Sequence, residues 1–207
     1  MVVNNIRNAT EQDVNSIKAI QDSWKYDPSK DWNTNAEEGF LICMMDISEI
    51  QEFLKRQDQY LLVYDRGEGI EGYLAAYDKE RWSQRDSKLS GALVPFYTPL
   101  ANVLRYYPYL YGRHIAKRKG APSNVAVDLE ERFFELARGK GLSWVVAEVA
   151  LNPYNKKSYE FNKRLGWNYI MDNYHDGAGW GVICKHLDNS PLWLNDMQPP
   201  SWWREQR

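Results

Sequence analysis

Apolar residues recur at the spacing of amphipathic helices in three segments, Val14–Ile20, Ile50–Leu54 and Val125–Ala137. Positions three and four residues apart share one face of a helix, so each segment predicts a helix with one buried face. A residue with a hydroxyl group precedes each segment at the position that caps a helix. These predicted caps are Thr10, with Asp13 forming a near capping box, Ser48 and Ser123.

Shorter apolar runs between these helices predict strands. The expected strands are Val3–Arg7, Tyr60–Tyr64, Ile70–Tyr77, Tyr109–Lys117, Leu142–Ala150, Asn168–Tyr174 and Gly181–Lys185. The turn Arg66–Gly69 indicates an antiparallel hairpin, whereas the helix that precedes Leu142 requires a parallel crossover. The predicted fold class is therefore α/β (α+β), a mixed sheet of about seven strands with helices on both faces.

Three segments interrupt this order. Asp27–Glu38 is polar, contains Pro28 and is expected to be a loop. Asp78–Pro108 is an insertion of about thirty residues, too long for a bare connection, so helices are expected in it, including Leu100–Arg105. Residues 188–207 form a tail rich in Trp and Pro, which is expected to pack on a single domain spanning residues 1–187.

Composition narrows the class of protein. A chain of 207 residues with a net charge of −2 suffices for one domain and has no field that favours nucleic acid or an anionic membrane. No apolar stretch reaches the ~20 residues of a membrane span, and the N-terminus lacks a secretory pattern. Cys43 and Cys184 lack the spacing of a disulfide framework or a metal site. We therefore expect a cytoplasmic protein with buried, reduced cysteines and no metal.

The segment Asn152–Trp167 carries the most specific pattern, NPYNKKSYEFNKRLGW. It follows a strand and combines an asparagine turn, a short helix that opens at Tyr154 or Asn155, and a glycine followed by an aromatic residue. This arrangement resembles the pantetheine-binding segment of GNAT-type N-acetyltransferases. The matching positions are Asn155, Ser158, Phe161, Leu165, Gly166 and Trp167. With the order of the elements, the resemblance extends from Ile6 to about Leu187.

The resemblance implies a GNAT-like acyl-CoA N-acyltransferase fold that binds acetyl-CoA. Strands Tyr109–Lys117 and Leu142–Leu151 would run parallel and splay apart in a V, leaving backbone groups to pair with pantetheine. The pyrophosphate would lie at the start of helix Asn124–Arg138, and a backbone N–H near Ile115 or Ala116 would hold the oxyanion. The implied cofactor-binding residues are Ile115, Ala116, Lys117, Lys119, Ser123, Asn124, Val125, Ala126, Asn155, Ser158 and Phe161.

Two features depart from the family pattern. The family's phosphate loop has Arg or Gln, then Gly, then Gly or Ala, where this chain has Ala121, Asn124 and Ala126. The run Lys117–Lys119 could supply positive charge instead, or it is a solvated turn; both interpretations stay open. Asn162 stands where the family often has a tyrosine that protonates the leaving thiolate, and an amide can only hydrogen-bond to the sulfur.

The acceptor amine must lose a proton, and the sequence offers three groups that could accept it. Glu148 is a lone carboxylate within an apolar strand, where burial would raise its pKa; a solvated residue or an ion pair is the alternative. His114 lies on the other splayed strand and is either a base or a structural histidine. Glu71, on the hairpin, is a third candidate. The predicted catalytic residues are Glu148, Asn162 and His114.

The predicted function is transfer of an acetyl group from acetyl-CoA to a primary amine of a small molecule or peptide. Trp180 and the aromatic residues of the insertion and tail could wall the acceptor pocket, fill the core or form a contact in a homodimer. A non-catalytic acyl-CoA-binding protein of the same fold is one alternative. A surface for RNA over Tyr106–Lys119 is another, and the near-zero net charge argues against it.

Overall fold

The computed structural model describes residues 5–79, 107–175 and 177–188. The helices are η1 (a 3₁₀ turn, Glu11–Asp13), α1 (Val14–Ser23), α2 (Trp32–Glu38), α3 (Ile47–Lys55), α7 (Asn124–Gly139) and α8 (Lys156–Arg164). The strands are β1 (Ile6–Asn8), β2 (Gln59–Asp65), β3 (Ile70–Asp78), β4 (Tyr109–Lys117), β5 (Trp144–Asn152), β6 (Asn168–His175) and β7 (Ala178–His186). The order of elements expected from the sequence is confirmed, with α2 added.

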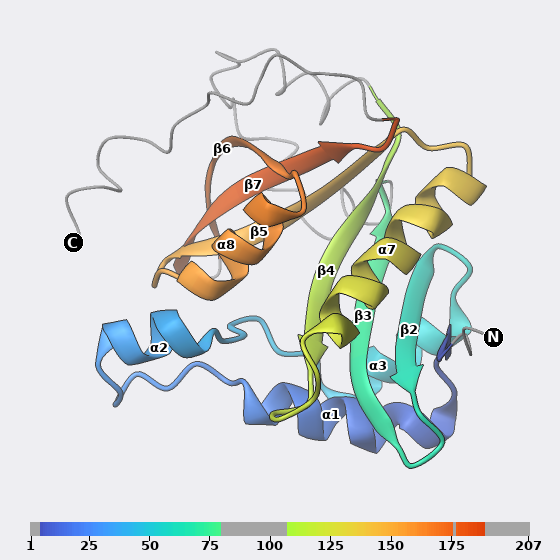
Figure 1. Cartoon of the computed structure of the whole chain (residues 1–207), viewed down its shortest axis with the longest axis horizontal. Coiled ribbons are helices and arrows are strands. Elements are labelled where there is room, and N and C mark those ends of the chain that lie inside the picture. Colours follow the sequence, from blue (N-terminus) through green and yellow to red (C-terminus); the bar gives the residue numbers. More distant parts are fainter. Residues whose placement is uncertain (1–4, 80–106, 176, 189–207) are drawn as a thin grey trace.

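The strands form one sheet of seven in the order β1-β2-β3-β4-β5-β7-β6 (Figure 1). Neighbouring strands are antiparallel except for β4 and β5, which are parallel and joined through α7. A strand–helix–strand connection produces this parallel pair, as predicted. The mixed sheet is therefore confirmed.

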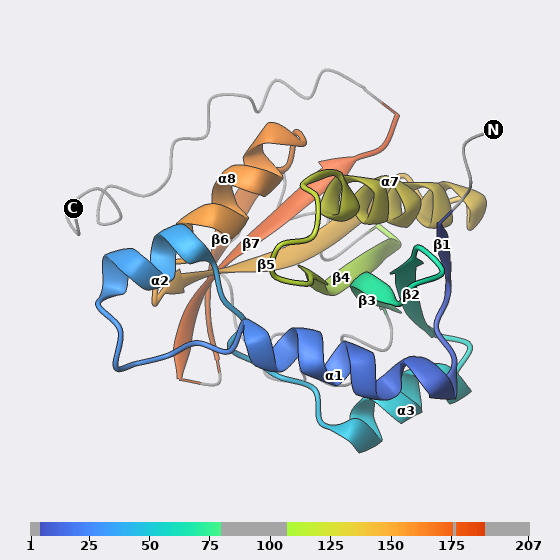
Figure 2. The same cartoon turned by 60° about the horizontal axis from the view of Figure 1, so that its bottom comes forward.

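Helices cover both faces of the sheet, and each face has its own core (Figure 2). On one face α1 and α3 pack through Ile17, Ile50 and Phe53 against the tyrosines of β3 and β4. On the other face α7 packs through Leu129 and Phe133, and α8 lies beside it on the same side. The alternation of side chains along each strand separates the two cores.

The parallel strands β4 and β5 pair only over their first four residues, and the pairing ends at Gly112 and Ala147. Beyond this point β4 continues along β3 to Lys117, and β5 continues along β7 to Asn152. The two strands therefore separate in a V, which Figure 1 shows as ribbons that meet at one end and diverge at the other. The predicted splay is confirmed.

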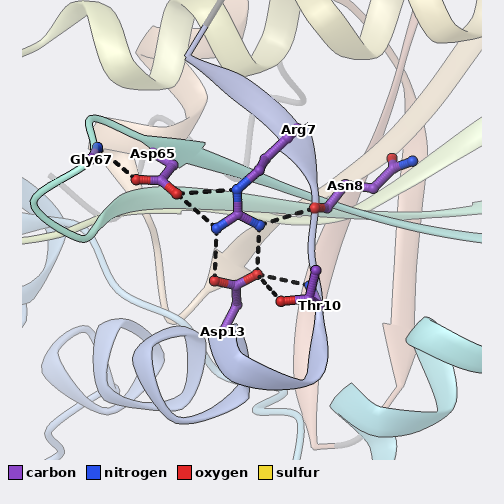
Figure 3. Close-up of polar contacts among 6 residues, drawn as sticks. All are labelled: Arg7, Asn8, Thr10, Asp13, Asp65 and Gly67. Atoms are coloured by element: carbon purple, nitrogen blue, oxygen red, sulfur yellow. Dashed lines mark hydrogen bonds and ion pairs between the residues drawn. The ribbon is translucent and has the colours of Figure 1, made fainter.

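Arg7 of β1 ties the start of the chain to two other elements (Figure 3). Its guanidinium donates to both carboxylate oxygens of Asp13, at 2.7 and 3.0 Å, and to Asp65 at 2.7 Å. Asp13 also accepts from the backbone N–H of Thr10 at 2.7 Å, as the predicted capping box requires. Asp65 in turn accepts from the N–H of Gly67 at 2.8 Å, so the network joins η1 to the β2–β3 turn.

The prediction that Asp27–Glu38 is a loop is wrong for its second half, which forms α2. Asp31 caps this helix, because its carboxylate accepts from two backbone N–H groups of the first turn. Only Asn35 and Ala36 of α2 are buried, so the apolar periodicity that marks a helix is missing from its sequence.

The predicted caps hold in part. Asp46, not Ser48, caps α3, because its carboxylate accepts from the N–H of Glu49 at 2.8 Å while Ser48 lies inside the helix. Ser123 occupies the N-cap of α7 as predicted, but its side chain makes no capping hydrogen bond.

The predicted insertion and tail fall largely on residues 80–106 and 189–207, outside the described residues, and so do the helix and the packing expected of them. Within the described part of the chain, no helix combines the length and the apolar character that crossing a membrane requires.

Candidate active site

A cavity of about 380 Å³ opens where β4 and β5 separate. Its walls come from both strands, from α7 and α8, and from residues 40–43 between α2 and α3. Phe133 and Trp167 from the α7 core line it, and so do Tyr77 and Tyr111 from the opposite core. The cavity therefore reaches both faces of the sheet.

On the α7 face, Glu130 places a buried carboxyl group in the cavity wall, with 3% of the residue exposed. Trp167 donates its indole N–H to Oε1 of Glu130 at 2.7 Å. Burial raises the pKa of Glu130 to about 7, and the bond from Trp167 and the charge of Lys185 oppose the rise. This residue was not among those predicted from the sequence. Its spacing of three and four residues before Phe133 and Phe134 was the signal that it shares their buried face.

On the opposite face, Glu148 of β5 lines the cavity as predicted. Its Oε2 accepts from the hydroxyl of Tyr111 at 2.7 Å, and its Oε1 accepts from the amide of Asn173 at 2.8 Å. Burial, followed by the neighbouring charge of Glu148, raises the pKa of Tyr111 well above its usual value, so Tyr111 acts as a fixed donor. Strands β4 and β6, on the two sides of β5, thus hold the carboxylate in one orientation.

Arg113 of β4 also lines the cavity and was not predicted. It occupies a bulge, because Gly112 and His114 pair with consecutive residues of β3. Its Nη1 donates to Oε1 of Glu49 on α3 and to the hydroxyl of Tyr77 at 2.5 Å. Only 9% of the Arg113 side chain is exposed, so a buried cation lies one strand away from the carboxylate of Glu148.

The two other predicted residues of β4 at this level also face the cavity. His114 is buried, and its Nδ1 lies 3.5 Å from the hydroxyl oxygen of Tyr73, whose ring it meets edge to face. Ile115 lines the cavity and pairs with Leu74 of β3 on its other side. Ala116 instead packs in the core beneath α1.

The predicted residues of α8 lie along one wall. Asn155, Ser158 and Asn162 line the cavity, whereas Phe161 is not among the lining residues. Asn155 caps the helix by accepting from the N–H of Ser158 at 3.1 Å, and it donates to the carbonyl oxygen of Phe40 at 2.7 Å. Asn162 donates to the carbonyl oxygen of Ser158 at 2.8 Å. Asn155 therefore shapes the site by holding residues 40–43 against α8.

The predicted phosphate end surrounds the start of α7, apart from the cavity. Lys117 donates to the carbonyl oxygen of Ala121, and burial together with the nearby charge of Lys157 lowers the pKa of Lys117. The ammonium groups of Lys119 and Lys157 lie 5.0 and 5.6 Å from the ring centre of Trp24. Three lysines thus converge beside the open end of the V, and Lys157 is an addition to the predicted set.

The remaining predicted residues at this end lie apart from the cavity. Asn124 donates to Asp128 at 2.8 Å, and Val125 is fully buried in the α7 core. Ser123 and Ala126 lie in the same turn and are not among the cavity-lining residues. Glu71, the third candidate base, pairs with Arg118 and is also not among the residues that line the cavity.

Trp180 and one of the two cysteines also line the cavity. Neither cysteine forms a disulfide. Cys184 is buried, which raises its pKa to about 12, whereas Cys43 is only half-buried and lines the cavity, contrary to the expectation that both thiols are buried.

No protein-family model and no curated protein matches this chain. Solved structures do match. A ribosomal-protein-alanine N-acetyltransferase from Brucella melitensis is 17% identical, with a TM-score of 0.56 over 87% of this chain and 98% of that one. The yncA protein from Salmonella typhimurium, solved with its cofactor acetyl-CoA, is 16% identical, with a TM-score of 0.55 over 95% and 97%.

A GNAT-family protein from Desulfovibrio desulfuricans is 12% identical, with a TM-score of 0.59 over 88% of this chain and 98% of that one. The match spans nearly the whole length of each of these three proteins, and it includes the mixed sheet described above. The chain therefore has the fold of the GNAT N-acetyltransferases.

Proposed function

We propose that this chain is an acetyl-CoA-dependent N-acetyltransferase that moves an acetyl group to a primary amine. The observation that carries the proposal is the V between β4 and β5, which opens into a cavity with the carboxylate of Glu148 in its wall. The fold shared with acetyltransferases supports the same reaction class.

The chain's own groups fit the parts of coenzyme A. The backbone edges that β4 and β5 turn toward each other suit an amide-rich arm, because buried peptide groups need partners. The start of α7 suits the pyrophosphate through its N–H groups and dipole, with Lys117, Lys119 and Lys157 close by. Bound there, acetyl-CoA would supply a thioester carbonyl to the cavity.

Glu148 is the base of this proposal. A protonated amine cannot attack a carbonyl, so its proton must pass to an acceptor, directly or through water. Tyr111 and Asn173 each donate to one oxygen of Glu148 and hold the carboxylate in the cavity wall, where the amine or a water would meet it. A backbone N–H near Ile115 or Ala116 would hold the negative charge that develops on the attacked oxygen.

The leaving thiolate needs little assistance. A thiol with a pKa of ~8.5 departs tolerably as the anion and takes a proton from water. Asn162 lies in the cavity wall with one amide hydrogen bonded to Ser158, so it can offer the sulfur a hydrogen bond but no proton. Asn162 is therefore assigned to positioning the thioester.

A non-catalytic acyl-CoA-binding protein is the second candidate. Ala121 and Asn124 replace residues that the phosphate loop of the family carries, and Lys117 is engaged with the chain's own Ala121. Asn162 also stands where the family often has a tyrosine that protonates the leaving thiolate, so these three departures together are the basis for a protein that binds acyl-CoA without turnover.

Two measurements test the proposal. If acetyl-CoA binds only the folded chain, a concentration of 100 Kd adds ~2.7 kcal/mol to the free energy of unfolding, which a melting curve reports. Release of free thiol is then followed across a panel of amines. Binding with amine-dependent thiol release supports the transferase, binding without release supports the second candidate, and a melting curve unmoved by millimolar acetyl-CoA, CoA and longer acyl-CoA contradicts both.

A further inference from the structure

We propose that the amine acceptor is a free amino acid, whose carboxylate binds Arg113 while its amine faces Glu148. The inference rests on the proposed function and adds the chemical class of the acceptor. It comes from the pairing of a buried cation with a held carboxylate in one cavity wall.

Arg113 and Glu148 hold equivalent places on the two diverging strands. The last parallel pair is Gly112 with Ala147, so each charged residue is the first beyond the end of pairing. Both face the side of α1 and α3, since Arg113 contacts α3 and Glu148 contacts Tyr111 of that core. Neighbouring strands lie about 5 Å apart where they pair, so both groups are within reach of one small zwitterion.

The guanidinium of Arg113 keeps donors for a ligand. Both of its hydrogen bonds, to Glu49 and to Tyr77, come from Nη1. Within residues 5–79, 107–175 and 177–188, no acceptor is hydrogen-bonded to Nε or Nη2. Neither nitrogen is a buried atom that lacks a partner, so both are accessible. These two nitrogens form the fork that binds the two oxygens of a carboxylate in parallel.

Aromatic rings separate the two charges and fix their spacing. The rings of Tyr77 and Tyr111 stack with an interplanar angle of 5° and centres 6.1 Å apart. Tyr77 bonds to Arg113, and Tyr111 bonds to Glu148, so the stack joins the cation to the carboxylate. Two rigid rings hold both groups in fixed positions, which favours an acceptor whose amine and carboxylate are a fixed distance apart.

A purely structural Arg113 is the competing explanation, since its ion pair with Glu49 joins β4 to α3. That role accounts for Nη1 alone and gives no reason for a cation in the wall of the cavity. It also predicts no dependence of activity on the charge of the acceptor. Glu49 partly neutralises Arg113, so removing the charge of Glu49 should strengthen carboxylate binding.

The test compares amino acids with their own amides as acceptors. The amide keeps the side chain and the amine but lacks the carboxylate. Its amine is also less basic, so more of it is unprotonated at neutral pH, and basicity alone would favour the amide as acceptor. We expect kcat/KM to be about 10- to 100-fold higher for the amino acid, the value of a charge-assisted hydrogen bond. An amino-acid preference below twofold in an active enzyme overturns the inference and leaves the proposed function standing.

Two variants assign the effect to the residue. Arg113→Gln should bring the ratio of kcat/KM for amino acid and amide close to one, mainly through a higher KM for the amino acid. Glu49→Gln keeps a hydrogen-bond acceptor for Nη1 and should raise the ratio; it also decides the matter if Arg113→Gln does not fold. A ratio that neither variant changes overturns the inference, and thiol release with none of the acceptors overturns the proposed function itself.

Discussion

The indole N–H of Trp167 donates to the carboxyl group of Glu130 at 2.7 Å, joining the end of α8 to the middle of α7 across the cavity wall. Trp167 closes the segment that resembles a pantetheine-binding motif, whereas Glu130 lies on the helix that starts at the phosphate end. The pair brings a titratable carboxyl group to the α7 face of the cavity.

Replacement of Glu130 by Gln should change how stability depends on pH. Burial raises its pKa from 4.5 in the unfolded chain to about 7, so between these values the folded protein binds the extra proton and stability falls as pH rises. The full loss is about 3 kcal/mol, at 1.36 kcal/mol per unit. Glu130→Gln removes the loss and keeps an acceptor for Trp167, so it should exceed wild type in stability at pH 8 and approach it at pH 4.

Urea unfolding at pH 4, 5, 6, 7 and 8 measures this difference. Trp167→Phe serves as the companion variant, because it removes the bond that stabilises the carboxylate and should extend the fall to higher pH. Parallel stability curves for wild type and Glu130→Gln would show that the carboxyl group titrates normally in the folded chain.

The Arg7 network should make stability sensitive to acid (Figure 3). The hydrogen bond from Arg7 lowers the pKa of Asp13, so its contribution is present above the usual carboxyl range and is lost as pH falls through the lowered pKa. Asp13→Asn should cost about 1.5–3 kcal/mol at pH 7, typical of hydrogen bonds to charged groups. The side chain of Asp65 is 26% exposed against 7% for Asp13, so Asp65→Asn should cost less.

Urea midpoints of both variants at pH 7 and pH 3 provide the check. The gap between wild type and Asp13→Asn should narrow at pH 3, which lies below the usual carboxyl pKa of 3.8. Equal losses in the two variants at pH 7 would contradict the greater weight given to the buried carboxylate.

Gly72 of β3 should be intolerant of a side chain, because α7 packs directly on it. A Cβ there would lie 2.7 Å from Cγ1 of Val125 and 3.1 Å from Cδ1 of Leu129. Gly72→Ala should therefore cost about 1–3 kcal/mol and displace the start of α7. Gly139 is the matched control, since a Cβ there meets no described atom within 4 Å and alanine favours a helix by up to ~1 kcal/mol. Thermal unfolding of both variants measures the contrast, and a neutral Gly72→Ala would show that α7 adjusts freely.

Most of the fold could be predicted because its elements carry regular apolar patterns. The strand Tyr109–Lys117 matches its prediction in both bounds, and α7 differs by one residue at its end. By contrast, α2 buries only two residues and begins at the capping residue Asp31. Its sequence therefore lacks the apolar periodicity that predicts a helix. The last strand, β7, is longer than the predicted Gly181–Lys185, and a Cβ on its Gly179 would lie 3.2 Å from Cβ of Asn152.

The site could be predicted only where one strand or helix carries its residues. Glu148, Asn155, Ser158 and Asn162 fall on the cavity because a single strand–turn–helix unit presents them. Arg113 depends on a bulge in the β3–β4 pairing, which no pattern within β4 announces. Glu130 lies among the charged residues Asp128, Glu131 and Glu135, and only its spacing to Phe133 and Phe134 indicates that it shares their buried face.

Glu148→Gln should reduce kcat while leaving the fold intact. Gln keeps an acceptor for Tyr111 but cannot take up a proton, so we expect a loss of about 10²- to 10⁴-fold, the usual contribution of a general base. Glu71→Gln is the matched control, because Glu71 pairs with Arg118 and is not among the cavity-lining residues. Steady-state kinetics and melting temperatures of both variants separate effects on catalysis from effects on stability. An unchanged kcat in Glu148→Gln would mean that another group accepts the proton.

Asn155 has two functions that different substitutions should separate. Its side chain is an acceptor for the start of α8 and a donor to Phe40, and only 6% of the residue is exposed. Asn155→Ala removes both bonds and should cost about 1–2 kcal/mol for the cap, with more for the unpaired carbonyl of Phe40. Asn155→Ser keeps a capping oxygen but is too short to reach Phe40, so it should retain most of the stability.

Residues 40–43, which Phe40 anchors, line the cavity. Both variants should therefore raise the KM for the amine, because both release this segment, and only Asn155→Ala should unfold at clearly lower urea concentration. A wild-type KM in Asn155→Ser would mean that residues 40–43 stay in place without the hydrogen bond to Phe40. The function of Asn155 would then be limited to capping α8.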